Sequence, residues 1–271
     1  MSLSRSARSI GRLATGAAAL GLLLPVLTVR AFVPEPDRVG IAIARANIKA
    51  QRDQPLQLQL AIRIGGGPVV AQGELETQPS GLARLELRAA GGLLERHLLH
   101  SRGHAAARNG EPLDEPRAML PPVFLLQAGS LQAFQSLLQR FGIDPLLVGL
   151  APCGPENCYV LGDPNRVPPV PEESVPLEEA PPAALSERAP GSFGSLWVEK
   201  ENFQVRRMRS PGGTRVEFGP EASFGKIAVP AWFEVREAER DPVRFEIQGV
   251  SKSRLSPADF TVEWVNDSRV P

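Results

Sequence analysis

Hydrophobic and polar residues alternate along the stretch from Pro55 to Ala90. Leucine, or isoleucine further on, occupies every second position from Leu56 to Ile64, and the positions between them are mostly polar. Because successive side chains of a β-strand point to opposite faces, this pattern predicts a strand with one apolar face. Glycines or a Pro-Ser-Gly corner separate the following runs, so neighbouring strands are predicted to pair as antiparallel partners. The stretch therefore predicts a curved antiparallel sheet with one apolar and one polar face.

Two segments have helical spacing instead. The first, residues 36–49, begins at a proline and carries one apolar face, and it is predicted to pack on the sheet. The second is predicted to begin after the N-cap candidate Ser130 and to end at Gly142. Its apolar residues recur three and four positions apart: Leu131, Phe134, Leu137, Leu138 and Phe141. Together with the apolar run 123–126, this element is either a plug that fills the mouth of the sheet or a lid over a ligand.

Three histidines lie among the next predicted strands, residues 93–101 and 103–108. His97 and His100 point to opposite faces of a strand, so together with His104 they do not form a ready metal site. They are predicted to be surface or edge residues.

Alternation resumes after residue 193. Residues 197–200 and 203–209 are predicted to pair across a short turn, and residues 215–218 follow a Pro-Gly-Gly turn. A last strand alternates around Phe245, and residues 256–260 are predicted to close the regular part of the chain.

The first thirty residues differ from the rest. Arg5, Arg8 and Arg12 precede an apolar run that ends at small residues, which predicts a secretory signal peptide over residues 1–31. The run is shorter than the ~20 residues that a membrane-spanning helix needs. The alternative is an uncleaved membrane anchor, because Arg30 lies close to the small residues at the predicted end of the signal peptide. No cysteine follows the run, so lipid anchoring is not indicated.

Removal of the predicted signal peptide would leave 26 basic and 30 acidic residues, since the segment carries four arginines and no acid. The mature protein is then mildly acidic and exported. The formal net charge of the whole chain is zero, which argues against nucleic acid as a partner. Residues 163–192 are rich in proline, glutamate and alanine and predict a mobile acidic loop, either a solvated insertion or a docking segment. Residues 32–271 are thus predicted to be one domain with this loop inserted.

Cys153 and Cys158 are the only cysteines of the chain. In an exported protein such a close pair predicts a disulfide, and the turn-forming residues around it place the bridge at a hairpin tip. The alternatives are a redox pair, which more often has two intervening residues, and a metal site.

No catalytic motif is present in the sequence. It contains no Gly-rich phosphate loop, no H-E-x-x-H, no G-x-S-x-G and no metal-spaced Cys/His set. The acidic residues are scattered, so no general acid–base pair can be chosen from sequence. The chain is predicted to be non-enzymatic and to use no cofactor.

Several short segments carry a resemblance to a known family. Gln72-Gly73-Glu74-Leu75, followed by Gln78-Pro79, looks like a strand and turn of that family, and 124–126 falls where its central helix begins. Pro242 to Leu255, followed by Ser256 to Phe260, is similar to its last long strand and proline-containing exit. In these segments the chain resembles the periplasmic carriers that sort outer-membrane lipoproteins, with the LolA-like fold. The many prolines, the cysteine pair and the acidic loop indicate a divergent member.

The resemblance implies an α+β, mostly β fold: a strongly curved antiparallel sheet, an incomplete barrel, whose open side is covered by helices above an apolar cavity. It implies a periplasmic, non-enzymatic carrier that binds lipid or the acyl chain of a lipoprotein cargo, with an inner- or outer-membrane envelope protein as a further candidate partner. At ~0.8 kcal/mol per buried CH2, one long acyl chain gives micromolar binding or better. The candidate cavity residues are Leu56, Leu58, Leu60, Ile62, Leu75, Leu85, Leu87, Phe124, Leu126, Phe134 and Leu138.

A different class of function uses the same fold with a filled core, namely a structural or scaffold protein of the cell envelope. A sensor or anti-sigma-type domain is a third reading. The space enclosed between sheet and helix distinguishes carrier from scaffold, because ligand sites typically enclose ~300–1,000 Å3.

Overall fold

The computed structural model describes residues 33–100, 103–114, 117, 119–120, 122–166 and 193–267. The predicted signal peptide lies outside the described residues, and so does most of the predicted acidic loop, of which only residues 163–166 are described. One compact unit begins at Val33.

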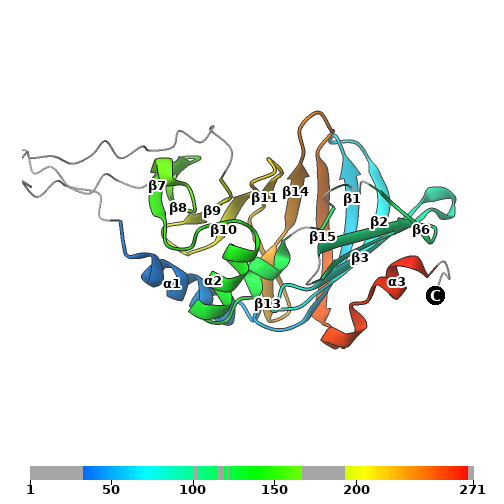
Figure 1. Ribbon diagram of the computed structural model, residues 1–271, viewed down its shortest axis with the longest axis horizontal. Helices are drawn as coiled ribbons and strands as arrows, with labels where there is room; N and C mark the ends of the chain where they lie inside the picture. The colour runs from blue at the N-terminus through cyan, green and yellow to red at the C-terminus, as the bar shows by residue number, and fades with distance from the viewer. Residues whose placement is uncertain are drawn as a thin grey trace, which may run out of the picture. The chain divides into compact units, whose positions relative to one another are not determined.

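Thirteen antiparallel strands form one sheet (Figure 1) in the order β6-β5-β4-β3-β2-β1-β15-β14-β11-β10-β9-β8-β7. Its edge strands, β6 and β7, do not pair with each other, so the barrel is incomplete, as predicted. A small second sheet pairs β12 with β13. The strands are β1 Leu56–Ile64, β2 Val69–Thr77, β3 Ala83–Ala89, β4 Leu94–His100, β5 Gly103–Arg108, β6 Glu111–Pro112, β7 Val148–Cys153, β8 Glu156–Leu161, β9 Ser195–Glu199, β10 Val205–Arg209, β11 Arg215–Phe218, β12 Glu221–Phe224, β13 Ile227–Pro230, β14 Trp232–Arg236 and β15 Val243–Lys252.

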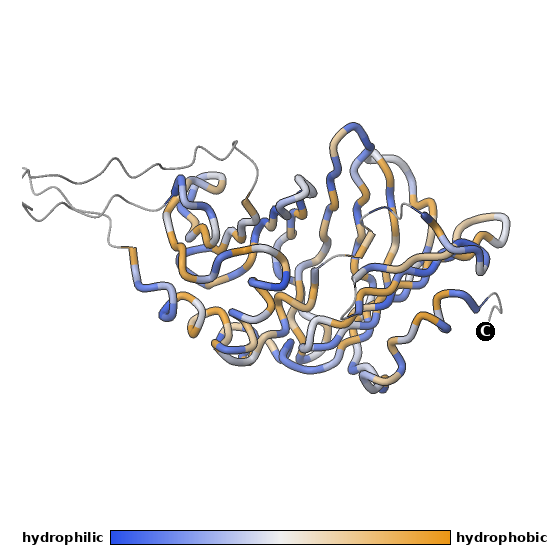
Figure 2. Tube along the Cα trace, viewed as in Figure 1, coloured by the Kyte–Doolittle hydropathy of each residue, from blue (hydrophilic) through white to orange (hydrophobic). Residues whose placement is uncertain are grey.

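The predicted alternation is confirmed in β1, whose bounds agree with the predicted strand. Leu56 lies opposite Thr77 of β2 on one side and opposite Lys252 of β15 on the other. The register of β1 shifts once against each neighbour, after Gln59 and after Ile62. Such bulges bend a strand and increase its twist, which contributes to the curvature of the sheet. Hydrophobic and hydrophilic residues follow one another along the strands in Figure 2.

The helical elements are α1 Pro36–Lys49, η1 Ala90–Gly92, η2 Val123–Gln127, α2 Leu131–Arg140, η3 Pro164–Arg166, η4 Pro257–Asp259 and α3 Val262–Asn266. The predicted N-cap of α2 is confirmed, because the Ser130 hydroxyl accepts a hydrogen bond from the backbone N–H of Ala133 at 3.2 Å. Gly142 follows the helix with a φ of 70°, a left-handed conformation that favours glycine, and so ends it as predicted. Among the described residues, no helix is long and apolar enough to cross a membrane.

The helices α1 and α2 and the turn η2 cover one face of the sheet, called here the inner face. Their buried residues, such as Ile43, Phe124 and Phe134, belong to the same core cluster as the leucines of β1. α1 and α2 lie side by side (Figure 1) and approach closely at Gly40. A Cβ atom added there would come within 2.6 Å of Leu131 Cδ1. The two helices therefore form one layer against the inner face.

The prediction that regular structure ends at Phe260 is wrong. The short helix α3 follows and packs on the opposite, outer face of β4 and β5, where Val265 and Phe260 form a second small core with Leu98 and Ala107. Only Val265 of its five residues is buried, so α3 offers no apolar periodicity to read from sequence.

The predicted disulfide joins Cys153 at the end of β7 to Cys158 in β8, with their Cα atoms 5.7 Å apart. The two strands form a hairpin around Gly154 and Pro155. The bridge thus lies at a hairpin tip, as predicted.

Candidate functional site

The eleven candidate cavity residues all lie on the inner face or on the elements that cover it. Each exposes 6 % or less of its surface, and all belong to one core cluster. Nine of them, five from the strands and four from η2 and α2, are packed together in this core and do not line a hollow: Leu56, Leu58, Leu60, Leu75, Leu85, Phe124, Leu126, Phe134 and Leu138. The other two, Ile62 and Leu87, line an open hollow.

This hollow, called here the inner hollow, has a volume of about 570 Å3. Residues near the ends of strands line it, and so do Leu113, Arg117 and Met119, which follow β6 in the chain. Its apolar lining is mostly aliphatic: Ile62, Ile64, Val70, Ala71, Leu87, Ala89, Leu93, Leu113 and Met119. The volume lies within the ~300–1,000 Å3 that is typical of ligand sites.

Two local features shape the wall. Val70 is the extra residue of the bulge between β1 and β2, because Ile62 lies opposite Ala71 and Arg63 opposite Val69. The bulge lets the consecutive residues Val70 and Ala71 line the same hollow, which strict alternation would forbid. The second feature is Gly73, whose Cα faces the side chains of Ile62 and Leu87.

A Cβ atom at Gly73 would come within 2.9 Å of Leu87 Cδ2 and 3.1 Å of Ile62 Cδ1. The glycine therefore allows the two side chains to settle against the sheet, and a larger residue there would push them into the hollow.

Arginines stand at the rim of the inner hollow. Arg108 donates from Nε and Nη2 to Oε2 of Glu95 at 3.1 and 2.9 Å. Arg117 donates from Nε to Glu237 at 3.1 Å and from Nη2 to the carbonyl oxygen of Asp241, and Arg240 also donates to Glu237, at 3.2 Å. Arg117 thereby ties the segment after β6 to the β14–β15 turn.

The prediction that the histidines are surface or edge residues is wrong for His97, which is fully buried on the inner face. Its Nε2 lies 2.7 Å from Oε1 of Glu95 and its Nδ1 lies 3.1 Å from Nε2 of His104. A hydrogen bond from His97 and the guanidinium of Arg108 lower the pKa of Glu95 despite its burial. Burial, followed by the charge of His97, lowers the pKa of His104 to about 4.

The signal for this cluster lies in the pairing of β4 with β3 rather than in the local sequence. Glu95 and His97 lie opposite Leu87 and Leu85, so they belong to the apolar face of the sheet. No ready metal site was predicted from these histidines, and among the described residues no group of three or more His, Cys, Asp or Glu side chains is placed to hold a metal ion.

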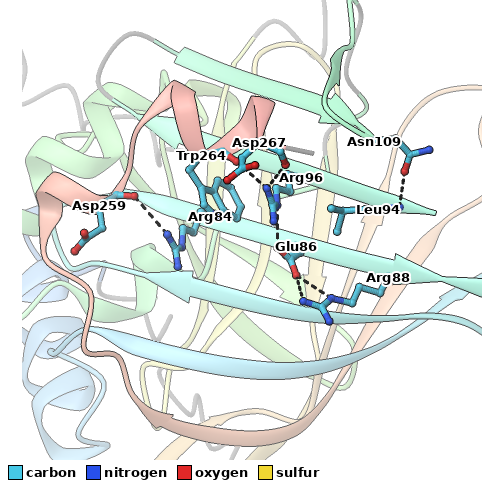
Figure 3. A network of polar contacts seen from close by, with 9 residues as sticks. All are labelled: Arg84, Glu86, Arg88, Leu94, Arg96, Asn109, Asp259, Trp264 and Asp267. Carbon is cyan, nitrogen blue, oxygen red and sulfur yellow. Dashed lines mark hydrogen bonds and ion pairs between the residues drawn. The ribbon is translucent and has the colours of Figure 1, made fainter. Parts of the chain in front are cut away.

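A second hollow, called here the outer hollow, has a volume of about 630 Å3 and lies on the outer face of β1 to β4 beside α3. Figure 3 shows that its polar side chains bind one another: Glu86 accepts from Arg88 and from Arg96, at 2.6 and 2.8 Å. Arg96 also donates to the carbonyl oxygens of Trp264, at 3.1 Å, and of Asp267. The arginine thus satisfies carbonyl groups at the end of α3, and the network anchors this helix to the sheet.

Glu76 is a further member of the outer hollow and is nearly buried, with 5 % exposure. Burial raises its pKa, against a hydrogen bond with Ser253 and the charge of Arg84. Arg84 in turn stacks over Trp264, 4.8 Å from the ring centroid. The outer hollow is therefore lined by a network of paired charged side chains, unlike the aliphatic inner hollow.

Comparison with known proteins rests on structure. No protein-family model and no curated protein matches the chain. A LolA superfamily protein from Nitrosomonas europaea superimposes with a TM-score of 0.52 over 86 % of this chain and 100 % of that one, at 12 % identity. The chain has the LolA-like fold.

Two other solved structures give lower TM-scores. A DUF1329 family protein from Desulfovibrio piger gives 0.47 at 12 % identity, covering 86 % of this chain and 100 % of that one. A domain assigned to outer-membrane lipoprotein sorting from Vibrio parahaemolyticus gives 0.44 at 9 % identity, covering 85 % and 100 %.

Proposed function

We propose that this LolA-like protein is a periplasmic, non-enzymatic carrier that binds lipid or an acylated, lipoprotein-type cargo through its inner hollow. The observation that carries the proposal is the aliphatic lining, including Ile62 and Leu87, of a hollow of about 570 Å3 on the inner face. Burial of an acyl chain against such a surface is favourable by ~0.8 kcal/mol per CH2. The scaffold alternative, in which the core is filled, does not require this apolar surface to be open to solvent.

The nine packed candidate residues have a second role in this proposal. Five of them lie on β1, β2 and β3 and belong to the same core cluster as Ile62 and Leu87, and the other four lie on η2 and α2. If η2 and α2 move away from the sheet, the hollow lengthens along β1 and a longer acyl chain can enter. These two elements are then the lid, and transfer of cargo to an envelope protein proceeds through their opening.

The direct test is binding of a fluorescent fatty-acyl probe to the protein without residues 1–31. Ile64 lines the inner hollow and is 40 % exposed, so Ile64→Glu tests the site without opening the packed core. Ile48 of α1 is 48 % exposed and outside the hollow, which makes Ile48→Glu a matched control. A carboxylate in the apolar hollow should weaken probe binding by about tenfold or more, because a charge loses solvation there.

The control variant should bind like the parent protein. If the parent protein ignores the probe and carries no lipid in native mass spectrometry after purification, the carrier function is wrong and the scaffold alternative takes its place. Equal loss in both variants would also argue against the inner hollow as the site.

A further inference from the structure

We infer that the inner hollow takes a single-chain amphiphile with an anionic headgroup, a carboxylate or a phosphate, which Arg108 and Arg240 bind at the rim. This inference rests on the proposed function, because it concerns the headgroup of the same ligand. Four features of the hollow support it: the unused N–H donors of Arg108 and Arg240, the hydrogen bonds that already occupy Glu95, the separate role of Arg117, and the volume of the apolar space.

Arg108 and Arg240 each keep N–H donors that have no hydrogen-bond partner among the described residues. Within the described part of the chain, Arg108 uses only Nε and Nη2, both toward Glu95, and Arg240 uses only Nη1, toward Glu237. A guanidinium carries five N–H donors, so each arginine keeps two or more for a ligand. Their side chains are 53 % and 50 % exposed and line the hollow, so these donors are accessible from it.

Glu95, the one acid among the described residues that line the hollow, is already engaged. Its Oε1 faces His97 Nε2 at 2.7 Å and its Oε2 accepts both hydrogen bonds from Arg108. The pKa of Glu95 is lowered by these contacts, so the group stays ionised and holds Arg108 in place. The described part of the lining therefore offers a ligand free donors rather than free carboxylate oxygens, which favours an anion over a cation.

Arg117 has a different role. It donates to Glu237 and to the carbonyl oxygen of Asp241, and only 24 % of its side chain is exposed. It is a positioning residue that ties its own part of the lining to the β14–β15 turn. Arg117 stays unchanged in the test, since its loss would alter the lining itself.

The apolar lining determines which hydrocarbon part of the ligand can bind. Apart from Glu95 and the arginines, the described lining is apolar and the volume is about 570 Å3, which suits one chain that lies against Ile64, Val70 and Leu93. A chain seated there brings its polar end to the rim, where a carboxylate or phosphate can accept from a guanidinium. Charge complementarity at an exposed rim weakens as ionic strength rises.

The experiment measures the affinity of the protein for three fluorescent probes with the same alkyl chain: a carboxylate, its methyl ester and a trimethylammonium analogue. The carboxylate should bind roughly three- to tenfold more tightly than the ester, and the cation more weakly still. Its advantage should shrink in high salt. Inorganic phosphate alone should not displace the carboxylate probe at equal ionic strength, because the chain carries most of the affinity.

Variants assign the effect to the rim. Arg108→Gln combined with Arg240→Gln should lose the preference for the carboxylate while the ester binds as before. Arg215→Gln, at a 47 % exposed arginine outside the hollow, is the matched control and should keep the preference. Equal binding of all three probes overturns the inference and leaves the carrier function standing. Binding of none overturns both.

Displacement of the carboxylate probe by inorganic phosphate alone would show a free-anion site and overturn the inference as well. A preference that survives the double variant would place the headgroup away from Arg108 and Arg240.

Discussion

Arg96 ties the C-terminal helix α3 to the outer face of the sheet. It is 4 % exposed and binds Glu86 and the backbone at the end of α3. Removal of one partner from a buried ion pair typically costs ~3–5 kcal/mol, so Arg96→Met should lower the free energy of unfolding by about 3 kcal/mol. Urea unfolding measures this change.

Arg88 provides the control, because it binds the same Glu86 from a side chain that is 47 % exposed. Exposed ion pairs contribute about 0–1 kcal/mol, so Arg88→Gln should change stability little. Similar losses in both variants would contradict the role assigned to Arg96.

His104 makes stability depend on pH. Its pKa is lowered to about 4 by burial and by the charge of His97, whereas an unfolded histidine has a pKa of ~6.5. Between these values the unfolded chain binds a proton that the folded chain does not, so stability falls as pH drops from about 6.5 toward 4. We expect a loss of roughly 2 kcal/mol across this window. Urea unfolding at several pH values measures the slope, which His104→Gln should reduce; an unchanged slope would assign it to other groups.

At the scale of elements, the layer of α1 and α2 depends on a missing side chain. A Cβ at Gly40 would lie 2.6 Å from Leu131 Cδ1 and 3.4 Å from Phe134 Cδ1. Gly40→Leu should push the helices apart and lower the free energy of unfolding by about 1–3 kcal/mol, as overpacking does. Arg45→Leu, at an exposed position of the same helix, is the control in thermal or urea unfolding. A Gly40 variant as stable as this control would show that the helices are not tightly packed.

The disulfide closes a loop of only a few residues, with a sequence separation of 5 between Cys153 and Cys158. The chain-entropy estimate for so short a loop is about 2 kcal/mol. Replacement of both cysteines by alanine should lower the unfolding free energy by about this amount, and reduction of the parent protein should have the same effect. A stability that neither change alters would leave the bridge without a structural role.

Local elements were largely readable from the sequence, and long-range pairing was not. The alternation from Leu56 to Ile64 gave the bounds of β1, and Ser130 and Gly142 gave the ends of α2, because both signals lie within a few residues. The pairing of β1 with β15 joins Leu56 to Lys252, nearly two hundred residues away, and no local pattern records it. The burial of His97 followed from its strand face, but only once Leu85 was known to lie opposite.

For the whole molecule, the alternation identified the apolar face but not which part of it is filled. Leu58 and Ile62 follow the same pattern, yet Leu58 is packed and only Ile62 reaches the inner hollow. The difference depends on where η2 and α2 dock and on the bulge at Val70, both products of tertiary structure. Sequence therefore predicted the surface and the fold, and the hollow required the structure.

Methyl NMR with a spin-labelled fatty acid can locate an acyl chain in the inner hollow, because the label broadens nearby methyl signals. We expect broadening at Ile62, Ile64, Val70 and Leu87, with Val262 of α3 unaffected. Broadening confined to other methyl groups, or none at saturating fatty acid, would show that the chain does not bind in the inner hollow.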